Sequence, residues 1–290
     1  MDVRHHPFDV ISVQHISYVY TIRIQSSINY LPLRAIIQNF IVGGENIVFN
    51  FPAEEDYIKR NEPRFGETIG RVANGIKDAV VHLNERDYTL DKNYPPNSIH
   101  SGFNQDNDGR FLGTVDVTAV LEIEYEVSAR HMECDQTSVS VTNHSYFKLT
   151  GNTTIDGTVA QLSARKYLPI NQAGIPIGTV EDFPTDITSH FLLQESSPAI
   201  DNCFVPYTTI DPFKVPLDTR QLDLQLLGFF KHPDSGIHLE VFSTYGSRAG
   251  FCVEPGRFIN AINQPAWRTM SLLKKGQVYG SKIVYESWKE

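Results

Sequence analysis

His144 is the first residue whose surroundings suggest proton-transfer chemistry. It lies in residues 141–147 (VTNHSYF), where an alternating apolar segment gives way to polar and aromatic side chains. Histidine gains and loses a proton close to neutral pH, which suits a general acid or base. A histidine beside serine and tyrosine is also common as a hydrogen-bonded structural residue. The spacing alone leaves both interpretations open.

Glu254 is the second candidate. It ends the apolar segment of residues 250–256 (GFCVEPG), where proline and glycine enforce a bend directly after it. A carboxylate flanked in this way is expected to be partly buried, which would raise its proton affinity and suit a general base. The alternative is an N-cap or turn acceptor, because Pro255 fits the first position of a short helix.

Two further polar residues, His100 and Asp201, lie within or beside structured stretches. Either side chain is suited to hydrogen-bond a hydroxyl of a ligand, and either is equally suited to close a turn, which is common for the pair Asp201 and Asn202. The glycines of residues 66–75 do not follow a phosphate-binding order. Neither a metal-ligand pattern nor the G-x-S-x-G elbow of serine hydrolases is present.

The composition limits the class of partner. The chain has 290 residues and a formal net charge of -9, which argues against nucleic acid or an anionic membrane surface and favours a neutral ligand. Apolar runs are too short to span a bilayer, and the polar start does not resemble a secretory leader, so we expect a cytoplasmic location. Three scattered cysteines predict buried free thiols rather than disulfides.

Strand signals dominate the elements that would position these residues. Mixtures of β-branched and aromatic residues predict strands in residues 36–51, 139–141, 221–230 and 237–244, with turn formers around them. Short helices are expected only at residues 53–60 and 255–261. With no linker or repeat, the sequence predicts one all-β domain over residues 1–290, built from two packed antiparallel sheets.

Residues 115–127 show the clearest alternation in the chain. Valine, alanine, leucine, isoleucine and tyrosine occupy one face, acidic residues and threonine occupy the other, and only Val120 departs from the pattern. A strand of this length without turn chemistry exceeds the usual range.

Together these segments resemble the aldose 1-epimerase family, whose members include galactose mutarotases. The matching stretches, in order, are residues 64–74 (RFGETIGRVAN), 96–100 (PNSIH) and 141–147, Asp201 with Phe204, and residues 250–254 with 261–265 (AINQP). The resemblance implies a large antiparallel β-sandwich of the galactose mutarotase type, which agrees with the strand pattern. It also implies a small-molecule sugar substrate and no cofactor or metal, and leaves the oligomeric state open.

The resemblance assigns the two central roles. By position Glu254 corresponds to the base that removes the proton from the anomeric O1 hydroxyl, and His144 to the acid that protonates the ring oxygen O5. It places Asn74, His100, Tyr146 and Asp201 around the sugar.

Two positions depart from the family pattern, which commonly has arginine at Gly75 and glutamine at Tyr245. Arg71 lies near Gly75 in the sequence, and Tyr245 occupies the position of the glutamine. We therefore include Arg71 and Tyr245 among the candidate substrate-binding residues. Three loops are also shorter than in the family, at residues 102–110, 118–119 and 245–249, and the middle one is where a hairpin turn would interrupt residues 115–127.

Other functions remain open on the sequence alone. A relative acting on hexose 6-phosphates would need basic residues over the phosphate, and a sugar-binding or regulatory relative would keep the fold without turnover. A glycoside hydrolase would need two carboxylates, whereas the resemblance supplies one carboxylate and one histidine.

Overall fold

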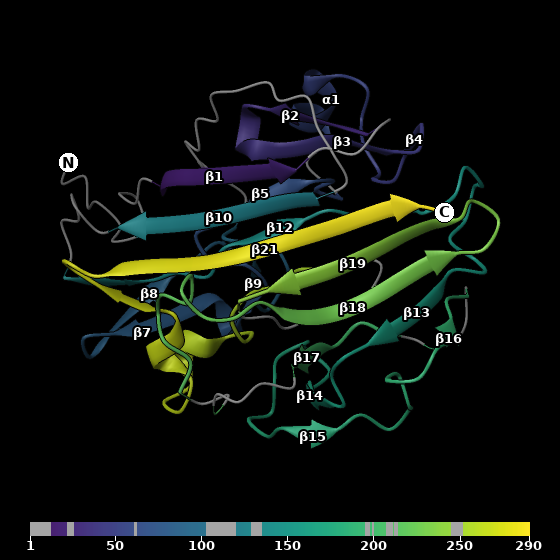
Figure 1. The fold of residues 1–290 in the computed structure, drawn as a ribbon. Helices are drawn as coiled ribbons and strands as arrows, with labels where there is room; N and C mark the ends of the chain where they lie inside the picture. Colours follow the sequence, from purple (N-terminus) through teal and green to yellow (C-terminus); the bar gives the residue numbers. More distant parts are fainter. Residues whose placement is uncertain are drawn as a thin grey trace.

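Seven antiparallel strands form the largest sheet, which crosses the front of the molecule in Figure 1. The structure is a computed structural model, and it describes residues 13–21, 26–60, 63–102, 120–128, 135–194, 198, 200–206, 211, 214–244 and 252–290. The strand order is β1 (Val13–Thr21), β10 (Val120–Ser128), β21 (Val278–Lys289), β19 (Ile237–Ser243), β18 (Gln225–His232), β13 (Val159–Leu162) and β16 (Phe191–Leu192).

Shorter strands make up smaller sheets, several of which lie behind the large sheet (Figure 1). The three-stranded sheets are β2 (Ser27–Leu31), β3 (Ile36–Val42) and β4 (Glu45–Asn46), and β15 (Glu181–Asp182), β14 (Lys166–Leu168) and β17 (Cys203–Val205). The pairs are β5 (Glu67–Ile69) with β12 (Thr142–His144), β6 (Gly75–Ile76) with β9 (Ser98–Ile99), β7 (Val80–Leu83) with β8 (Arg86–Thr89), and β11 (Gln136–Ser138) with β20 (Leu272–Lys274).

The main hydrophobic core lies between the large sheet and these shorter strands. Leu121, Ile123 and Tyr125 point into it from β10, and Val141 and Phe147 reach it from the opposite layer. This packing of two β layers confirms the predicted sandwich. The alternation predicted for residues 115–127 is confirmed over β10, which begins at Val120; residues 115–119 lie outside the described residues.

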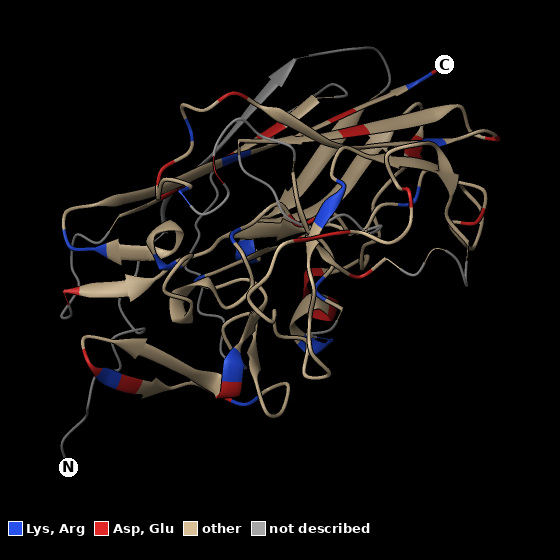
Figure 2. Cartoon of the chain, turned by 90° about the horizontal axis from the view of Figure 1, so that it is seen from below, with Lys and Arg blue, Asp and Glu red and all other residues tan. Residues whose placement is uncertain are grey.

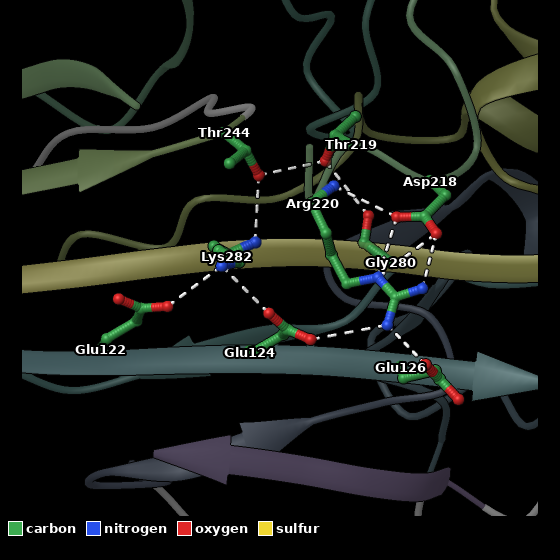
Figure 3. Close-up of polar contacts among 9 residues, drawn as sticks. All are labelled: Glu122, Glu124, Glu126, Asp218, Thr219, Arg220, Thr244, Gly280 and Lys282. Carbon is green, nitrogen blue, oxygen red and sulfur yellow. Dashed lines mark hydrogen bonds and ion pairs between the residues drawn. The ribbon is translucent and has the colours of Figure 1, made fainter. Parts of the chain in front are cut away.

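The outer face of the large sheet carries the acidic side of the same alternation. Glu122 and Glu124 pair with Lys282 on β21 at 3.2 Å and 3.1 Å. Arg220, from a segment beside β21, contacts Glu124 and Glu126 (Figure 3). These half-buried ion pairs attach that segment to the sheet.

Other predicted elements agree in part with the structure. Helix α1 (Glu54–Lys59) confirms the helix predicted at residues 53–60, and turns at residues 43–44 and 233–236 join β3 to β4 and β18 to β19. Residues 139–141 are extended but link β11 to β12 rather than forming a strand.

The helix predicted at residues 255–261 is wrong. Residues 255–260 form no helix, because Arg257 donates its backbone N–H to the hydroxyl of Ser140 and Asn260 takes a left-handed conformation with φ of 57°. The remaining helical turns are 3₁₀: η1 (Leu33–Ala35), η2 (Lys77–Ala79), η3 (Ala261–Asn263) and η4 (Arg268–Met270).

Charged residues of both signs are interspersed over the described chain (Figure 2). No helix in the described part is long and apolar enough to cross a membrane. Cys203 is a buried free thiol as predicted, whereas Cys252 is only partly buried and Cys134 lies outside the described residues. The single domain over residues 1–290 stays a prediction.

Candidate active site

The segment around strand β12 has one face toward the core and the other toward the candidate site. Val141 and Asn143 face the large sheet, where they lie within hydrogen-bonding distance of the hydroxyls of Tyr279 and Tyr285. Since successive side chains of an extended chain point to opposite faces, His144 projects away from the large sheet. The alternating apolar pattern read from the sequence therefore positions the histidine.

Glu254 reaches His144 by the same alternation in a second segment. An antiparallel bridge joins Cys252 to Tyr146, and Val253 is buried in the core, so its neighbours project toward His144. Oε1 of Glu254 lies 3.5 Å from Nε2 of His144. The two residues are 4% and 6% exposed. The structure thus brings both predicted proton-transfer residues together in a buried setting.

Cys252 contacts both members of this pair. Its Sγ is 3.5 Å from Nδ1 of His144 and 3.7 Å from Oε1 of Glu254. The sequence predicted a buried free thiol, and only its position two residues before Glu254 hinted at this placement. A thiol in contact with a histidine is a candidate for elevated reactivity.

His100 follows β9 and packs edge-on against the ring of His144, with centroids 5.1 Å apart. Its backbone N–H donates to the carbonyl of Asn74, and its Nδ1 accepts the backbone N–H of Asn74 at 3.2 Å. Both residues have positive φ, 50° and 66°, and both are buried. The short β6–β9 pair thus holds His100 and Asn74 beside the catalytic candidates.

The tautomer of His100 decides what this cluster can bind. His100, His144 and Glu254 each offer a ligand atom within 4.8 Å of the others, and zinc uses such donors. The lone pair on Nδ1 of His100 already accepts the N–H of Asn74, so the neutral ring carries its proton on Nε2. That nitrogen is a hydrogen-bond donor and not a metal ligand. The arrangement therefore favours a polar, oxygen-bearing substrate, and the absence of a metal stays a prediction.

Asn74 also lines a pocket. Asn74 and Asp201 both line it, together with Gly75 and the apolar side chains of Ile175 and Ile259. Its lining does not include His144 or Glu254. A Cβ at Gly75 would lie 3.3 Å from Cδ1 of Ile175, so the position has little room for a larger side chain. Asp201 is thus grouped with Asn74 but not directly with the catalytic candidates.

The other predicted contacts are placed less completely. The ring of Tyr146 lies 5.1 Å from that of His144 and packs edge-on against Phe65. Arg71 is half-buried, and its carbonyl accepts the N–H of Ser140, which leaves its proposed role in sugar binding a prediction. Tyr245 and the three short loops fall mainly or wholly outside the described residues.

Glu67 is a buried carboxylate that the sequence did not single out. It is 1% exposed and lies directly opposite His144 in the β5–β12 pair. Nη1 of Arg34 donates to its Oε1 at 3.0 Å, and Arg64 lies 3.9 Å from its Oε2. Burial raises the pKa of Glu67, and the two arginines and His144 oppose that rise. The signal in the sequence was its place in residues 64–74, a stretch that resembles the family.

Comparison with known proteins agrees with the family resemblance read from the sequence. The family model for aldose 1-epimerase matches residues 31–115 and 110–286. The chain is 31% identical to the bifunctional protein gal10 of Schizosaccharomyces pombe over 86% of this chain and 42% of that protein. It is 26% identical to the galactose mutarotase of Sus scrofa over 81% of each. The chain spans less than half the length of the bifunctional relatives that it matches.

A solved structure supports the fold. The GalM/aldose epimerase homologue from C. elegans superposes with a TM-score of 0.75 over 95% of this chain and 99% of that one, at 20% sequence identity. The family model covers most of the chain and shows the family without this structural likeness. The chain belongs to the aldose 1-epimerase family.

Proposed function

We propose that this protein is an isomerase that interconverts the α and β anomers of free hexoses such as glucose and galactose. The observation that carries the proposal is the buried pair of Glu254 and His144, with Oε1 and Nε2 3.5 Å apart. O1 and O5 of a pyranose are bonded to the same carbon, so a base and an acid that serve them must lie close together.

The proposed reaction moves two protons. Glu254 accepts the proton of the O1 hydroxyl while His144 donates a proton to O5. The C1–O5 bond breaks, its electrons go to O5, and C1 and O1 become an aldehyde. After rotation about C1–C2, O5 attacks the other face of C1, His144 recovers its proton and Glu254 returns one to O1. Atoms and charges balance, and the enzyme ends in its starting state.

The neighbouring residues suit recognition of hydroxyls. His100 presents an Nε2–H donor beside the pair, and Asn74 and Asp201 line the adjoining pocket. Because the pair must face C1, this pocket would take a more distant part of the sugar. We also propose that the protein works in the cytoplasm and has no nucleic-acid or membrane partner, as its acidic charge favours.

Polarimetry on freshly dissolved α-glucose and α-galactose tests the function. Wild type should speed the change in rotation, and His144→Ala and Glu254→Gln should each lose about 10²–10⁴-fold in kcat. Matched controls are His82→Ala and Glu122→Gln, which remove an exposed histidine and a carboxylate on the outer face of the sheet.

A wild type no faster than buffer on either hexose contradicts the proposal. The same assay on glucose 6-phosphate, followed by calorimetry with each sugar, then separates a sugar-phosphate enzyme from a sugar-binding protein.

A further inference from the structure

Glu67 shares a strand face with His144. The register of β5 and β12 pairs His144 with Glu67 and Asn143 with Thr68. Directly opposite residues in an antiparallel pair have neighbouring side chains on the same face. Thr68 and Asn143 approach the core tyrosines Tyr125 and Tyr285. Glu67 and His144 therefore project together to the opposite side, where the candidate site lies.

Two arginines hold Glu67 in place. Arg34 comes from η1 and bonds one carboxylate oxygen, and Arg64 comes from the segment before β5 and approaches the other. The side chains of Arg34 and Arg64 are 17% and 7% exposed. Removing one partner of such a buried pair leaves an uncompensated charge, so the three charges act as a unit.

We propose that Glu67, held by Arg34 and Arg64, is a positioning residue whose negative charge stabilises the protonated imidazolium form of His144. The inference rests on the proposed function, in which His144 must carry a proton to act as the acid. Glu67 does not touch the sugar in this scheme. It acts through His144 from the neighbouring strand.

Several other groups face His144, and the test must separate Glu67 from them. Glu254 and Cys252 contact it from the segment before Pro255, His100 from the end of β9, and Tyr146 from its own segment. Behind Glu67 lie the two arginines and Tyr57 of α1, whose pKa is raised by burial and further by Glu67. Only Glu67 supplies negative charge to His144 from β5.

Two opposing effects act on the charge of Glu67. Burial raises the pKa of its carboxyl group, but the guanidinium of Arg34 at 3.0 Å, the nearby Arg64 and His144 all oppose that rise. A carboxylate between two permanently charged guanidinium groups remains ionised near neutral pH.

The first test is the pH profile of kcat/KM for wild type, Glu67→Gln and Arg34→Gln on α-glucose. Activity should fall at high pH as His144 loses its proton. Glu67 lies directly opposite His144 in the strand pair, so Glu67→Gln should move that basic limb down by about one pH unit. Arg34→Gln removes a positive charge but leaves Arg64 beside Glu67 to keep it ionised, and should therefore move the limb up.

Opposite shifts of the basic limb in Glu67→Gln and Arg34→Gln separate an electrostatic role from a structural one. Loss of folded protein lowers the activity of a variant at every pH and does not move its basic limb. Circular dichroism and urea unfolding identify variants that fold poorly, and if Glu67→Gln fails to fold, Arg34→Gln still tests the direction. Glu122→Gln on the outer face should leave the basic limb in place.

The second test does not need activity. NMR titration of the His144 ring, assigned by its absence in His144→Ala, should show a lower midpoint in Glu67→Gln and a higher midpoint in Arg34→Gln. An unchanged midpoint, or shifts of one sign in both folded variants, overturns the inference. If wild type lacks epimerase activity but the midpoints move as expected, the proposed function fails and the coupling between Glu67 and His144 stands.

Discussion

Sγ of Cys252 lies 3.5 Å from Nδ1 of His144, while Nε2 of the same ring lies 3.5 Å from Oε1 of Glu254. Both ring nitrogens thus have a partner within the segment of residues 252–254, and the thiol lies beside the acid–base pair. This arrangement makes Cys252 a sensitive position from which to probe the site.

Alkylation of Cys252 should abolish the proposed activity. A carboxamidomethyl group on Sγ would lie against both His144 and Glu254 and obstruct the space between them and the sugar. Iodoacetamide should abolish anomer interconversion, saturating galactose should slow the loss, and Cys252→Ser should resist it. Peptide mass spectrometry checks the modified site, and Cys203 should stay unmodified because it is buried. Full activity with stoichiometric modification of Cys252 would contradict this prediction.

His144 and Glu254 should behave as a unit in a double-mutant cycle. In the proposed reaction each residue protonates or deprotonates one end of the same bond change, so once one is lost the other has little left to assist. The double variant His144→Ala/Glu254→Gln should lose about as much kcat as the more damaged single variant, rather than the product of the two losses. Single-turnover polarimetry measures this, and fully multiplicative losses would mean that the two residues act in separate steps.

Gly280 should be essential for the close approach of two segments. A Cβ at this position would overlap both Oδ1 of Asp218 and the side chain of Arg220, in the segment drawn over β21 in Figure 3. Gly280→Ala should lower the free energy of unfolding in urea by about 1–3 kcal/mol. Gly151→Ala is the matched control, because a Cβ there would meet its nearest neighbour at an ordinary 3.7 Å. Equal stability of the two variants would contradict the argument.

The Asp218–Arg220 pair should make stability depend on acid pH. Hydrogen bonds from the Arg220 side chain, more than any other cause, lower the pKa of Asp218. A carboxyl with a depressed folded-state pKa contributes stability that is present above its unfolded value of about 4 and is lost as pH falls through the folded value. Because the pair is partly exposed, the contribution should stay below about 1 kcal/mol and weaken in salt.

Urea unfolding at several pH values below 5 checks this dependence. The decline in stability should be shallower in Asp218→Asn than in wild type, and Arg220→Ala should reproduce it. A variant as acid-sensitive as wild type would show that the pair does not contribute.

Much of the fold could be read from the sequence because its strands obey a period of two. The alternation from Leu121 to Val127 indicated which face of β10 is buried. The resemblance to the family supplied the pairing of His144 with Glu254. The helix predicted after Glu254 was wrong because proline and glycine indicate a bend but not its direction. The hydrogen bond from the backbone N–H of Arg257 to Ser140 sets that direction.

The sequence by itself determined the β class, the family and the two candidate proton-transfer residues, since these depend on local periodicity and on short ordered motifs. Only the tertiary structure decided that Cys252 contacts both of those residues, that Nδ1 of His100 accepts the backbone N–H of Asn74, and that Glu67 lies opposite His144 between two arginines. These relationships depend on strand register and on contacts between segments far apart in the chain. Local sequence does not encode such pairings, because their energies arise only when the sheets are packed.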